Sequence, residues 1–440
     1  MTIEMVLPIL MFAFLLFFVL QGYPVAFVLG GLAVIFGFTG LGVKAFDISV
    51  FRMFSVMTNP ILVAVPMFVY MAVMLERSGI AEDMFHTMYV WMGRLRGGLA
   101  AGICGINTLI AATTGISGTG VITMGMLGIP AMSKRGYDEG LAAGTILASG
   151  TLGILIPPSI MLVIMGDMMG LSVGELFIAA IFPGLVLSGL YITYILVRSF
   201  LQPHIAPAMP KEERTLVPLR HKLQLIVTAL TPPIFLIFAV LGTIFFGIAT
   251  PTEAAGFGAF GAMLIALAKR RLKLATIKHC AIETLRITSM IYLIVLGATA
   301  FAGIFLGLGG GKLGQQFLLS VPGGRWGVLA MMMLLVFILG MFLDWLGILF
   351  ILIPIYMPVA ATLGFPMLWF AMLVAVNFQN SFLTPPFGPA LFWLKGVAPD
   401  LETSTIYRGV VPFIALQIIG LVLIILFPQI VLWLPSLMFR

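Results

Sequence analysis

The sequence predicts an all-α integral membrane protein built from two inverted-topology repeats, each with five crossings, one re-entrant hairpin and one proline-broken helix. Three observations predict this fold class: the composition, the lengths of the apolar segments, and proline landmarks that recur 228 residues apart. Of 440 residues, 61% are hydrophobic and only 9% are charged. A soluble chain of this length needs more charge to cover its surface, so we expect the protein to lie in a bilayer.

Composition and motifs exclude most soluble function classes. The two cysteines provide neither a disulfide framework nor metal-ligand spacing, and no HExxH, Walker, dinucleotide-binding or GxSxG motif occurs. We therefore expect no enzyme activity and no cofactor. A net charge of +7 could indicate nucleic acid, but the basic residues lie between apolar segments, where they set membrane topology. The apolar N-terminus lacks a basic region and a cleavage site, so we expect it to be retained as a membrane helix.

Segment lengths define the first repeat, 1–201. A helix crosses a bilayer with about 20 apolar residues, which predicts crossings at 3–21, 23–40, 51–75 and 174–198. The mixed segment at 80–95 is amphipathic and is expected to lie along the interface.

The segment 97–133 contains no charged residue, although it is too long for one crossing and short for two. Basic residues flank both of its ends. If these ends lie on one side of the membrane, the segment is a re-entrant hairpin with its tip at 113–120, TTGISGTG. Non-helical backbone at membrane depth is tolerated only inside protein or along a wet cavity, so the tip is a candidate binding site.

A second uncharged stretch is interrupted by adjacent prolines. Pro157 and Pro158 lie inside the predicted crossing 140–170. Proline removes a backbone donor and clashes with the preceding turn, so this helix should be broken.

The landmarks recur after a polar linker at 202–222. A shift of 228 residues carries the proline pair onto Pro385-Pro386 in the second repeat, 223–440. The matching hairpin is predicted at 326–363, with its tip at 344–347, and the matching broken helix at 366–395. Five crossings per half invert the second half relative to the first, which is a plan of secondary transporters.

The distribution of basic residues supports this topology. When the ends of the first hairpin are placed in the cytoplasm, eighteen of the 23 Lys and Arg residues fall on that side. Both termini are then predicted to be periplasmic.

Four strings carry a family resemblance: SGTLGILIPPSI, GIATPTEAAGFG, FLDWLGILFILIPIYMP and NFQNSFLTPPFGPALF. They resemble the large membrane subunit of TRAP (tripartite ATP-independent periplasmic) transporters along essentially the whole chain. The resemblance implies sodium-driven uptake of a small organic acid anion, such as a C4-dicarboxylate or 2-oxo acid, into bacteria across the inner membrane. It also implies a small four-helix membrane subunit and a periplasmic substrate-binding protein as partners. Members are elevators, in which a transport domain bearing both hairpins slides against a scaffold.

Half-helices that meet inside the membrane expose backbone N–H groups at one end and C=O groups at the other. The N-terminal ends favour an anion, and the carbonyl ends favour Na⁺, the one ion that we expect the protein to require. For the first sodium or coupling site we single out Ser117, Gly118, Thr119, Ser149, Gly150 and Gly153. The alternative is that Ser117 or Thr119 only caps the returning half-helix.

For the second sodium or coupling site we single out Asp344, Gly347, Asn377, Asn380, Ser381 and Thr384. Asp344 is the only charged residue between Arg325 and Lys395, and a carboxylate in a bilayer is usually functional. The alternative is an N-cap for the half-helix that follows. Glu253 is a second carboxylate, for which we expect an interfacial place. Substrate contacts are predicted at Thr119, Thr151, Pro157, Asn380 and Pro385.

Three other functions remain as alternatives. A self-sufficient ion-coupled carrier would share the architecture and need no binding protein. An intramembrane hydrolase would need a nucleophile–base pair or metal ligands at depth, and the four histidines lie near charged segments instead. A passive channel is disfavoured by two sealed half-helix segments.

Overall fold

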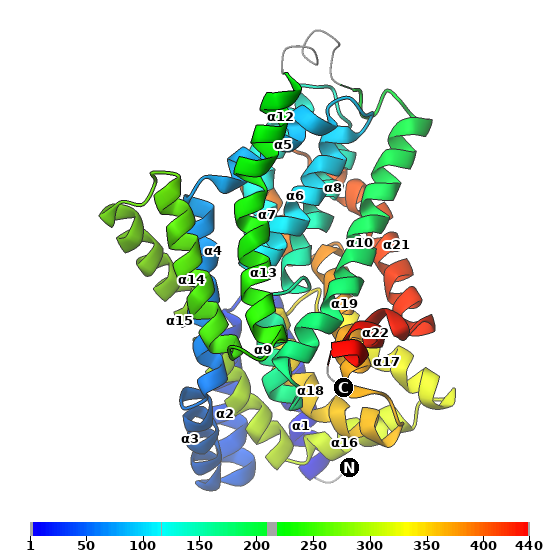
Figure 1. Cartoon of the computed structure of the whole chain (residues 1–440). Coiled ribbons are helices and arrows are strands. Elements are labelled where there is room, and N and C mark those ends of the chain that lie inside the picture. The colour runs from blue at the N-terminus through cyan, green and yellow to red at the C-terminus, as the bar shows by residue number, and fades with distance from the viewer. Residues whose placement is uncertain (1–2, 116, 209–217, 439–440) are drawn as a thin grey trace.

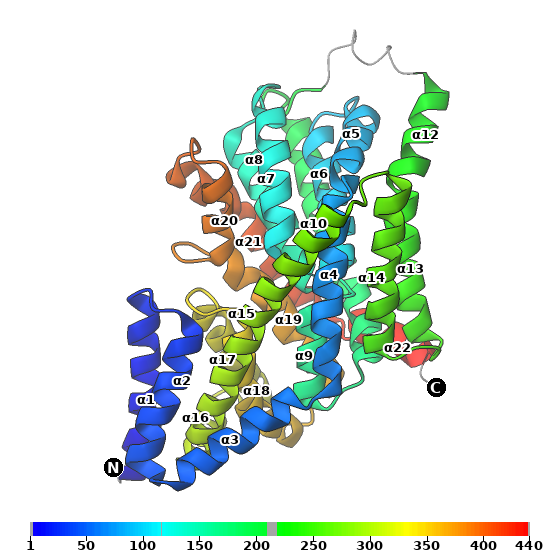
Figure 2. The same cartoon turned by 90° about the vertical axis from the view of Figure 1, so that its left-hand side faces the viewer.

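The computed structural model describes residues 3–115, 117–208 and 218–438, and within these ranges the regular elements are all helices (Figures 1 and 2). The predicted all-α membrane class is confirmed. By length and composition, seven helices in this part of the chain could each cross a membrane: Pro60–Arg77, Val173–Leu201, Arg220–Phe245, Pro251–Ala268, Leu274–Gly307, Trp345–Thr362 and Thr403–Leu426. Further apolar helices of 10–17 residues accompany them.

The first half runs from α1 to α10. Its elements are α1 (Ile3–Leu20), α2 (Val25–Leu41), α3 (Lys44–Met57), η1 (Pro60–Val63), α4 (Ala64–Arg77), α5 (Ile80–Met92), α6 (Gly98–Thr114), α7 (Ser117–Ser133), α8 (Glu139–Thr151), η2 (Leu152–Ile154), α9 (Ile160–Met169) and α10 (Val173–Leu201).

The second half runs from α12 to α22. Its elements are α12 (Leu219–Ala229), α13 (Thr231–Phe245), α14 (Pro251–Ala268), α15 (Leu274–Gly307), α16 (Gly310–Leu319), α17 (Gly324–Leu339), α18 (Trp345–Thr362), α19 (Met367–Leu383), α20 (Pro389–Val397), α21 (Thr403–Leu426) and α22 (Gln429–Met438).

Helix starts in the two halves follow the 228-residue spacing. α7 begins at Ser117 and α18 at Trp345, and α8 begins at Glu139 and α19 at Met367. Both proline pairs separate two helices, α8 from α9 and α19 from α20, because proline cannot continue a helix. The inverted relation between the halves, and the return of each hairpin to its own side of the membrane, stay predictions.

The segment predicted to cross at 51–75 is not one helix. α3 ends at Met57, and α4 begins at Ala64 after the short turn η1. Pro60 stands at the start of η1, and the Asn59 side chain accepts a hydrogen bond from Ile61 N at 2.9 Å, which caps the turn. The matching part of the second half has no such Asn-Pro pair and forms the 34-residue helix α15.

Two boundaries also differ from the sequence reading. The turn of the second hairpin covers 340–344, so Gly347 lies inside the first turn of α18. The polar linker predicted at 202–222 ends in a helix, because α12 already begins at Leu219. Residues 209–217 of that linker lie outside the described part of the chain.

The helices pack as two groups. The frame consists of α1–α4 and α13–α15, in which α4 packs against α14 and α15, and α15 also packs against α2 and α3. Figure 2 shows α15 running diagonally across this group. The core unit consists of α6–α10 and α17–α21 and contains the two hairpins and both proline-broken helices. The two groups meet where α18 contacts α15, where α6 contacts α4 and where α9 contacts η1.

The outer faces of the frame are apolar. Phe235 and Phe238 on α13 are 72% and 71% exposed, and Phe46 and Phe51 on α3 are 70% and 76% exposed. Large aromatic side chains in contact with solvent are unfavourable in water, whereas lipid tails are their natural surroundings.

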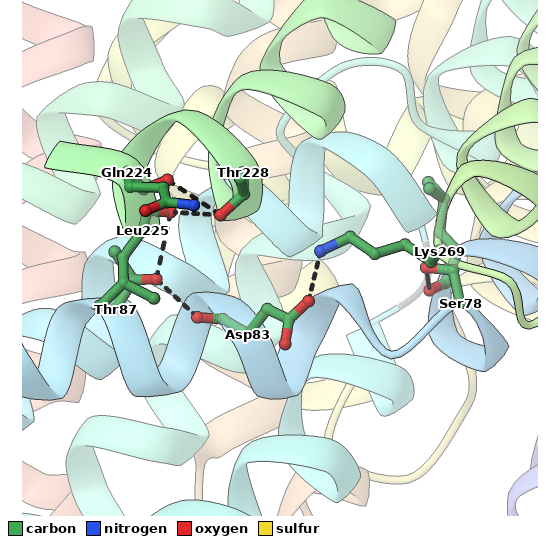
Figure 3. Close-up of polar contacts among 8 residues, drawn as sticks. Ser78, Asp83, Thr87, Gln224, Leu225, Thr228 and Lys269 are labelled. Atoms are coloured by element: carbon green, nitrogen blue, oxygen red, sulfur yellow. Dashed lines mark hydrogen bonds and ion pairs between the residues drawn. The ribbon is translucent and has the colours of Figure 1, made fainter. Parts of the chain in front are cut away.

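Helix α5 is joined to the end of α14 and to α12, which leads into α13 of the frame (Figure 3). Asp83 Oδ2 pairs with Lys269 Nζ, just beyond α14, at 2.5 Å. Thr87 Oγ1 lies 3.5 Å from the carbonyl of Leu225 in α12. Trp91 Nε1 donates to the carbonyl of Lys222, also in α12, at 3.1 Å. We assign α5 to the frame on these contacts, although α5 also packs closely against α6 of the core unit, where the chain passes from one group to the other.

Candidate functional site

The turn of the first hairpin rests on the first proline pair. Gly115, between α6 and α7, has a φ of +62°, a conformation that favours glycine. A Cβ on Gly115 would lie 2.8 Å from the carbonyl oxygen of Pro158. The hairpin turn and the break between α8 and α9 are thus in direct backbone contact, so the structure brings together the two parts of the predicted first site.

The start of α7 is also in close contact with the end of α8. A Cβ on Gly150 would lie 2.7 Å from the backbone nitrogen of Val121, and a Cβ on Gly120 would lie 3.1 Å from the Cα of Gly150. Only glycine permits this approach of two helix backbones. The buried Ser149 hydroxyl, one residue earlier, donates to the carbonyl of Thr145 at 2.6 Å.

Asn107 on α6 completes this group and was missed by sequence reasoning. Its Nδ2 donates to Ser149 Oγ at 2.9 Å, while its buried Oδ1 has no hydrogen-bond partner in the described structure. A Cβ on Gly120 would lie 3.4 Å from that oxygen, so Oδ1 faces the contact between α7 and α8. One signal was present, because Asn107 is the only carboxamide residue in the uncharged segment 97–133.

The second half builds a similar contact from different residues. Asn377 Nδ2 on α19 donates to the carbonyl of Met333 on α17 at 2.6 Å. At the end of α17, a Cβ on Gly340 would collide with Ser381 Oγ, so α17 and α19 also approach closely. The Ser381 hydroxyl donates to the carbonyl of Phe378 at 3.0 Å.

Asn380 is the buried polar residue of this second group that lacks partners. Its Oδ1 and Nδ2 are both without a hydrogen bond in the described structure, although only 1% of the residue is exposed. The neighbouring Gln379 shares this property. An unpaired buried amide loses its hydration without compensation, so such groups call for a ligand, an ion or ordered water.

Asp344 occupies the N-cap position of α18. It has extended backbone angles, and its Oδ2 accepts a hydrogen bond from Leu346 N at 3.4 Å. The capping alternative is therefore observed in the structure, and a role in cation coupling stays a prediction. Gly347 lies beside α2 of the frame, where a Cβ would be 3.7 Å from Val25 Cγ1.

The other predicted residues lie at helix ends around these contacts. Gly118 and Thr119 are in the first turn of α7, Thr151 ends α8, Gly153 is in η2, Thr384 is the C-cap of α19, and Pro157 and Pro385 begin the two proline pairs. Ser117 begins α7, but its side chain lies outside the described part of the structure. Glu253 is exposed at the start of α14, where it forms a capping box with Thr250.

The two halves are joined crosswise. The second helix of each hairpin packs against the far part of the opposite broken helix, α7 on α20 and α18 on α9, and α8 contacts α19. A Cβ on Gly118 would lie 3.7 Å from the indole ring of Trp393 on α20. Both groups of polar residues therefore belong to one packed unit.

The arrangement suits ions better than covalent chemistry. Unpaired amide oxygens, hydroxyls and carbonyls at helix ends are the hard oxygen donors that alkali and alkaline-earth cations prefer. Among the described residues, no three His, Cys, Asp or Glu side chains gather as they would to hold a transition metal.

Asp344→Asn separates capping from coupling. The amide keeps a carbonyl oxygen that can accept from Leu346 N, so protein yield and thermal stability should hold. If the carboxylate also engages a cation, half-maximal uptake should need about tenfold more sodium. The measurement is uptake against sodium concentration. If Asp344→Asn shows the sodium dependence of the wild type, helix capping is the whole role of Asp344. Ser381→Ala should shift the sodium dependence in the same direction as Asp344→Asn if both residues serve one site.

Comparisons with known proteins show the family of the chain. Residues 11–430 match the family described as the DctM component of the tripartite ATP-independent periplasmic transporter. The C4-dicarboxylate TRAP transporter large permease protein of Pseudomonas aeruginosa is 31% identical over 386 residues, 88% of each chain. The ectoine large permease protein of Halomonas elongata is 30% identical over 86% of this chain and 87% of its own.

A longer relative and a solved structure complete the comparison. The sialic acid TRAP transporter permease protein of Haemophilus influenzae is 30% identical over 383 residues. The match covers 86% of this chain and 60% of that longer protein. The YdaH transporter of Alcanivorax borkumensis shares the fold, with a TM-score of 0.64 at 13% identity, and the match covers 94% of this chain and 98% of that one. The resemblance found in the sequence is confirmed. The chain is thus a multi-pass membrane permease rather than an enzyme, and it belongs to the DctM component family of tripartite ATP-independent periplasmic transporters.

Proposed function

We propose that this permease takes up a small organic acid anion by sodium-coupled secondary active transport across a bacterial inner membrane. A periplasmic binding protein delivers the anion, a small four-helix membrane subunit is the second partner, and both termini of the chain are periplasmic. The observation that supports the coupling is the pair of buried polar groups around Asn107 and Asn380, which have unpaired amide oxygens at the two helix breaks.

The first group supplies a candidate cation site. Asn107 Oδ1 lies beside the contact of Gly120 with Gly150, close to Ser149 and to the carbonyl end of α8. A sodium ion there would satisfy the oxygen that has no hydrogen bond. In the second group, Asn380 and the carbonyls at the end of α19 would do the same.

The anion would be held without a basic side chain. Residues 97–133, 140–170 and 326–394, which cover the hairpins and the broken helices up to Lys395, contain no Lys, Arg or His. Backbone N–H groups at the starts of α7 and α18, the hydroxyl of Thr119 and the free amide of Asn380 are the available donors. The Thr151 hydroxyl donates to the carbonyl of Ala148 at 3.0 Å, so Thr151 would have to exchange that bond to bind the anion, and Pro157 and Pro385 would shape the walls. Bound sodium would offset the remaining negative charge.

The same topology implies an inward-facing state. Helix α2 begins on the cytoplasmic side in this topology. A Cβ on Gly347, in the first turn of α18, would lie 3.7 Å from Val25 and 4.0 Å from Leu29, which are in the first two turns of α2. The tip of the second hairpin thus lies near the cytoplasmic end of the frame. Transport would then carry the core unit outward along the frame, as an elevator built from two inverted repeats.

Reconstituted liposomes test this function. With the candidate partner proteins present, gradients of Na⁺, Li⁺ or H⁺ are imposed singly, and uptake of labelled organic acids is followed. We expect accumulation with an inward sodium gradient and no ATP. Undiminished uptake with a proton gradient alone would contradict the proposal.

Omitting one protein at a time separates the proposal from a self-sufficient carrier. We expect uptake from free solute to be lost without the binding protein. Robust uptake by this chain alone would favour the self-sufficient alternative.

Asn107→Ala probes the first cation site. Loss of one oxygen ligand should raise the sodium concentration for half-maximal uptake about tenfold, which corresponds to about 1.4 kcal/mol. Gln224→Ala, which removes an exposed carboxamide on α12, is the matched control and should behave as wild type. Equal sodium dependence in all three proteins would remove Asn107 from the site.

A further inference from the structure

We propose that the groove between the α5–α6 junction and the last turns of α10 binds an anionic phospholipid. The groove has a volume of about 550 Å³. Arg94, Leu95, Arg96, Leu196, Val197, Phe200 and Leu201 line it.

The charge of the groove is unbalanced. Arg94 and Arg96 are exposed, and among the described residues neither guanidinium has a hydrogen bond or an ion pair. Other basic residues near the same end of the molecule are engaged: Arg198 donates to Tyr194 Oη at 2.5 Å, and Lys269 pairs with Asp83. Two free guanidinium groups, one residue apart in a short loop, form a site for a phosphodiester, which they bind through paired N–H donors.

The opposite wall of the groove is apolar and open. Phe200 is 73% exposed, Leu201 72% and Val197 52%. These residues form the last two turns of α10, a span long enough to cross a membrane. The end of such a span lies at headgroup depth, so the guanidinium groups would meet the phosphate while an acyl chain lies along Val197 and Phe200. A free phosphate ion would leave this apolar wall uncovered.

The groove lies at the junction of the two helix groups. Helix α5 is attached to the frame, whereas α6 belongs to the core unit, and Gly97 between them has a φ of +72° and packs against Ser199 of α10. The nitrogen of Gly97 donates to the carbonyl of Ala206 at 3.0 Å. A bound lipid would therefore contact the segment that must bend when the core unit moves. An effect of the bound lipid on the rate of transport rests on the proposed function, whereas the binding itself does not.

Photolabelling tests the binding without any transport measurement. The purified chain in nanodiscs is exposed to phosphatidylglycerol with a diazirine in its acyl chain, and labelled peptides are mapped by mass spectrometry. We expect labelling of 196–201 to fall at least about fivefold in Arg94→Gln/Arg96→Gln. The control Arg220→Gln/Lys278→Gln removes two exposed charges elsewhere and should label as wild type.

Two further arms identify the source of the phosphate. A phosphatidylethanolamine analogue should label 196–201 weakly, and millimolar inorganic phosphate should leave the phosphatidylglycerol label in place. Equal labelling by both lipids, loss of label to inorganic phosphate, or equal labelling of the double variant would each overturn the proposal. If transport is established, phosphatidylglycerol should speed uptake in wild type and not in Arg94→Gln/Arg96→Gln. Failure of the sodium-coupling experiments would leave the labelling result intact.

Discussion

Gly150→Ala is expected to reduce uptake at least tenfold. The added Cβ would lie 2.6 Å from Val121 Cγ2, 2.7 Å from its nitrogen and 3.0 Å from its Cα. Two of these three atoms belong to the backbone of α7, which cannot rotate away as a side chain would, so α7 and α8 must separate. That separation would displace Asn107 from Ser149 and disturb the proposed cation site. The measurement is uptake in proteoliposomes at equal amounts of reconstituted protein.

Gly189→Ala is the matched control. It makes the same substitution in α10, where a Cβ would meet nothing within 4 Å, so uptake and stability should remain at wild-type values. Gly120→Ala adds a Cβ from the α7 side of the same contact. That Cβ would lie 3.1 Å from the Cα of Gly150, so the loss of uptake should be smaller than in Gly150→Ala. If Gly150→Ala elutes as a folded protein and transports normally, the close contact of α7 with α8 has no part in transport.

Cross-linking the frame to the core unit is expected to arrest transport. Asn59 Nδ2 in the frame donates to Asp167 Oδ2 on α9 of the core unit at 2.8 Å. This hydrogen bond joins two bodies that must slide past each other in an elevator, so it should break in each cycle. With Cys104 and Cys280 replaced, Asn59→Cys/Asp167→Cys treated with a short bifunctional thiol reagent should lose nearly all uptake, and a cleavable linker should restore it on reduction.

Asp83→Cys/Lys269→Cys is the comparison pair. These positions join α5 to the end of α14, which both move with the frame in this account, so the same cross-link should leave uptake largely intact. Normal uptake with a complete Asn59–Asp167 cross-link would contradict movement of the core unit along η1. Loss of uptake with both pairs would contradict the assignment of α5 to the frame.

Local rules predicted the helix breaks but not the partners of the buried polar groups. The pairs Pro157-Pro158 and Pro385-Pro386 break their helices through a steric effect that any sequence context shares. Asn59 and Pro60 carry a similar local signal, which was hidden inside an apolar run long enough for one crossing. The unpaired state of Asn107 and Asn380 depends on which helices meet after folding, and no spacing in the sequence encodes that. Arg94 and Arg96 were read only as topology signals, because the apolar wall facing them comes from residues about one hundred positions later.

Sodium binding to the chain alone tests the central claim most directly. A ligand that binds the folded state stabilises it, by about 2.7 kcal/mol when its concentration is one hundred times the Kd. We expect the melting temperature of the purified chain to rise with NaCl and not with equal KCl or choline chloride, and this rise to be lost in Asn107→Ala/Asn380→Ala. A melting temperature that responds equally to all three salts, or a sodium-specific rise that persists in the double variant, would contradict a sodium site at these helix breaks.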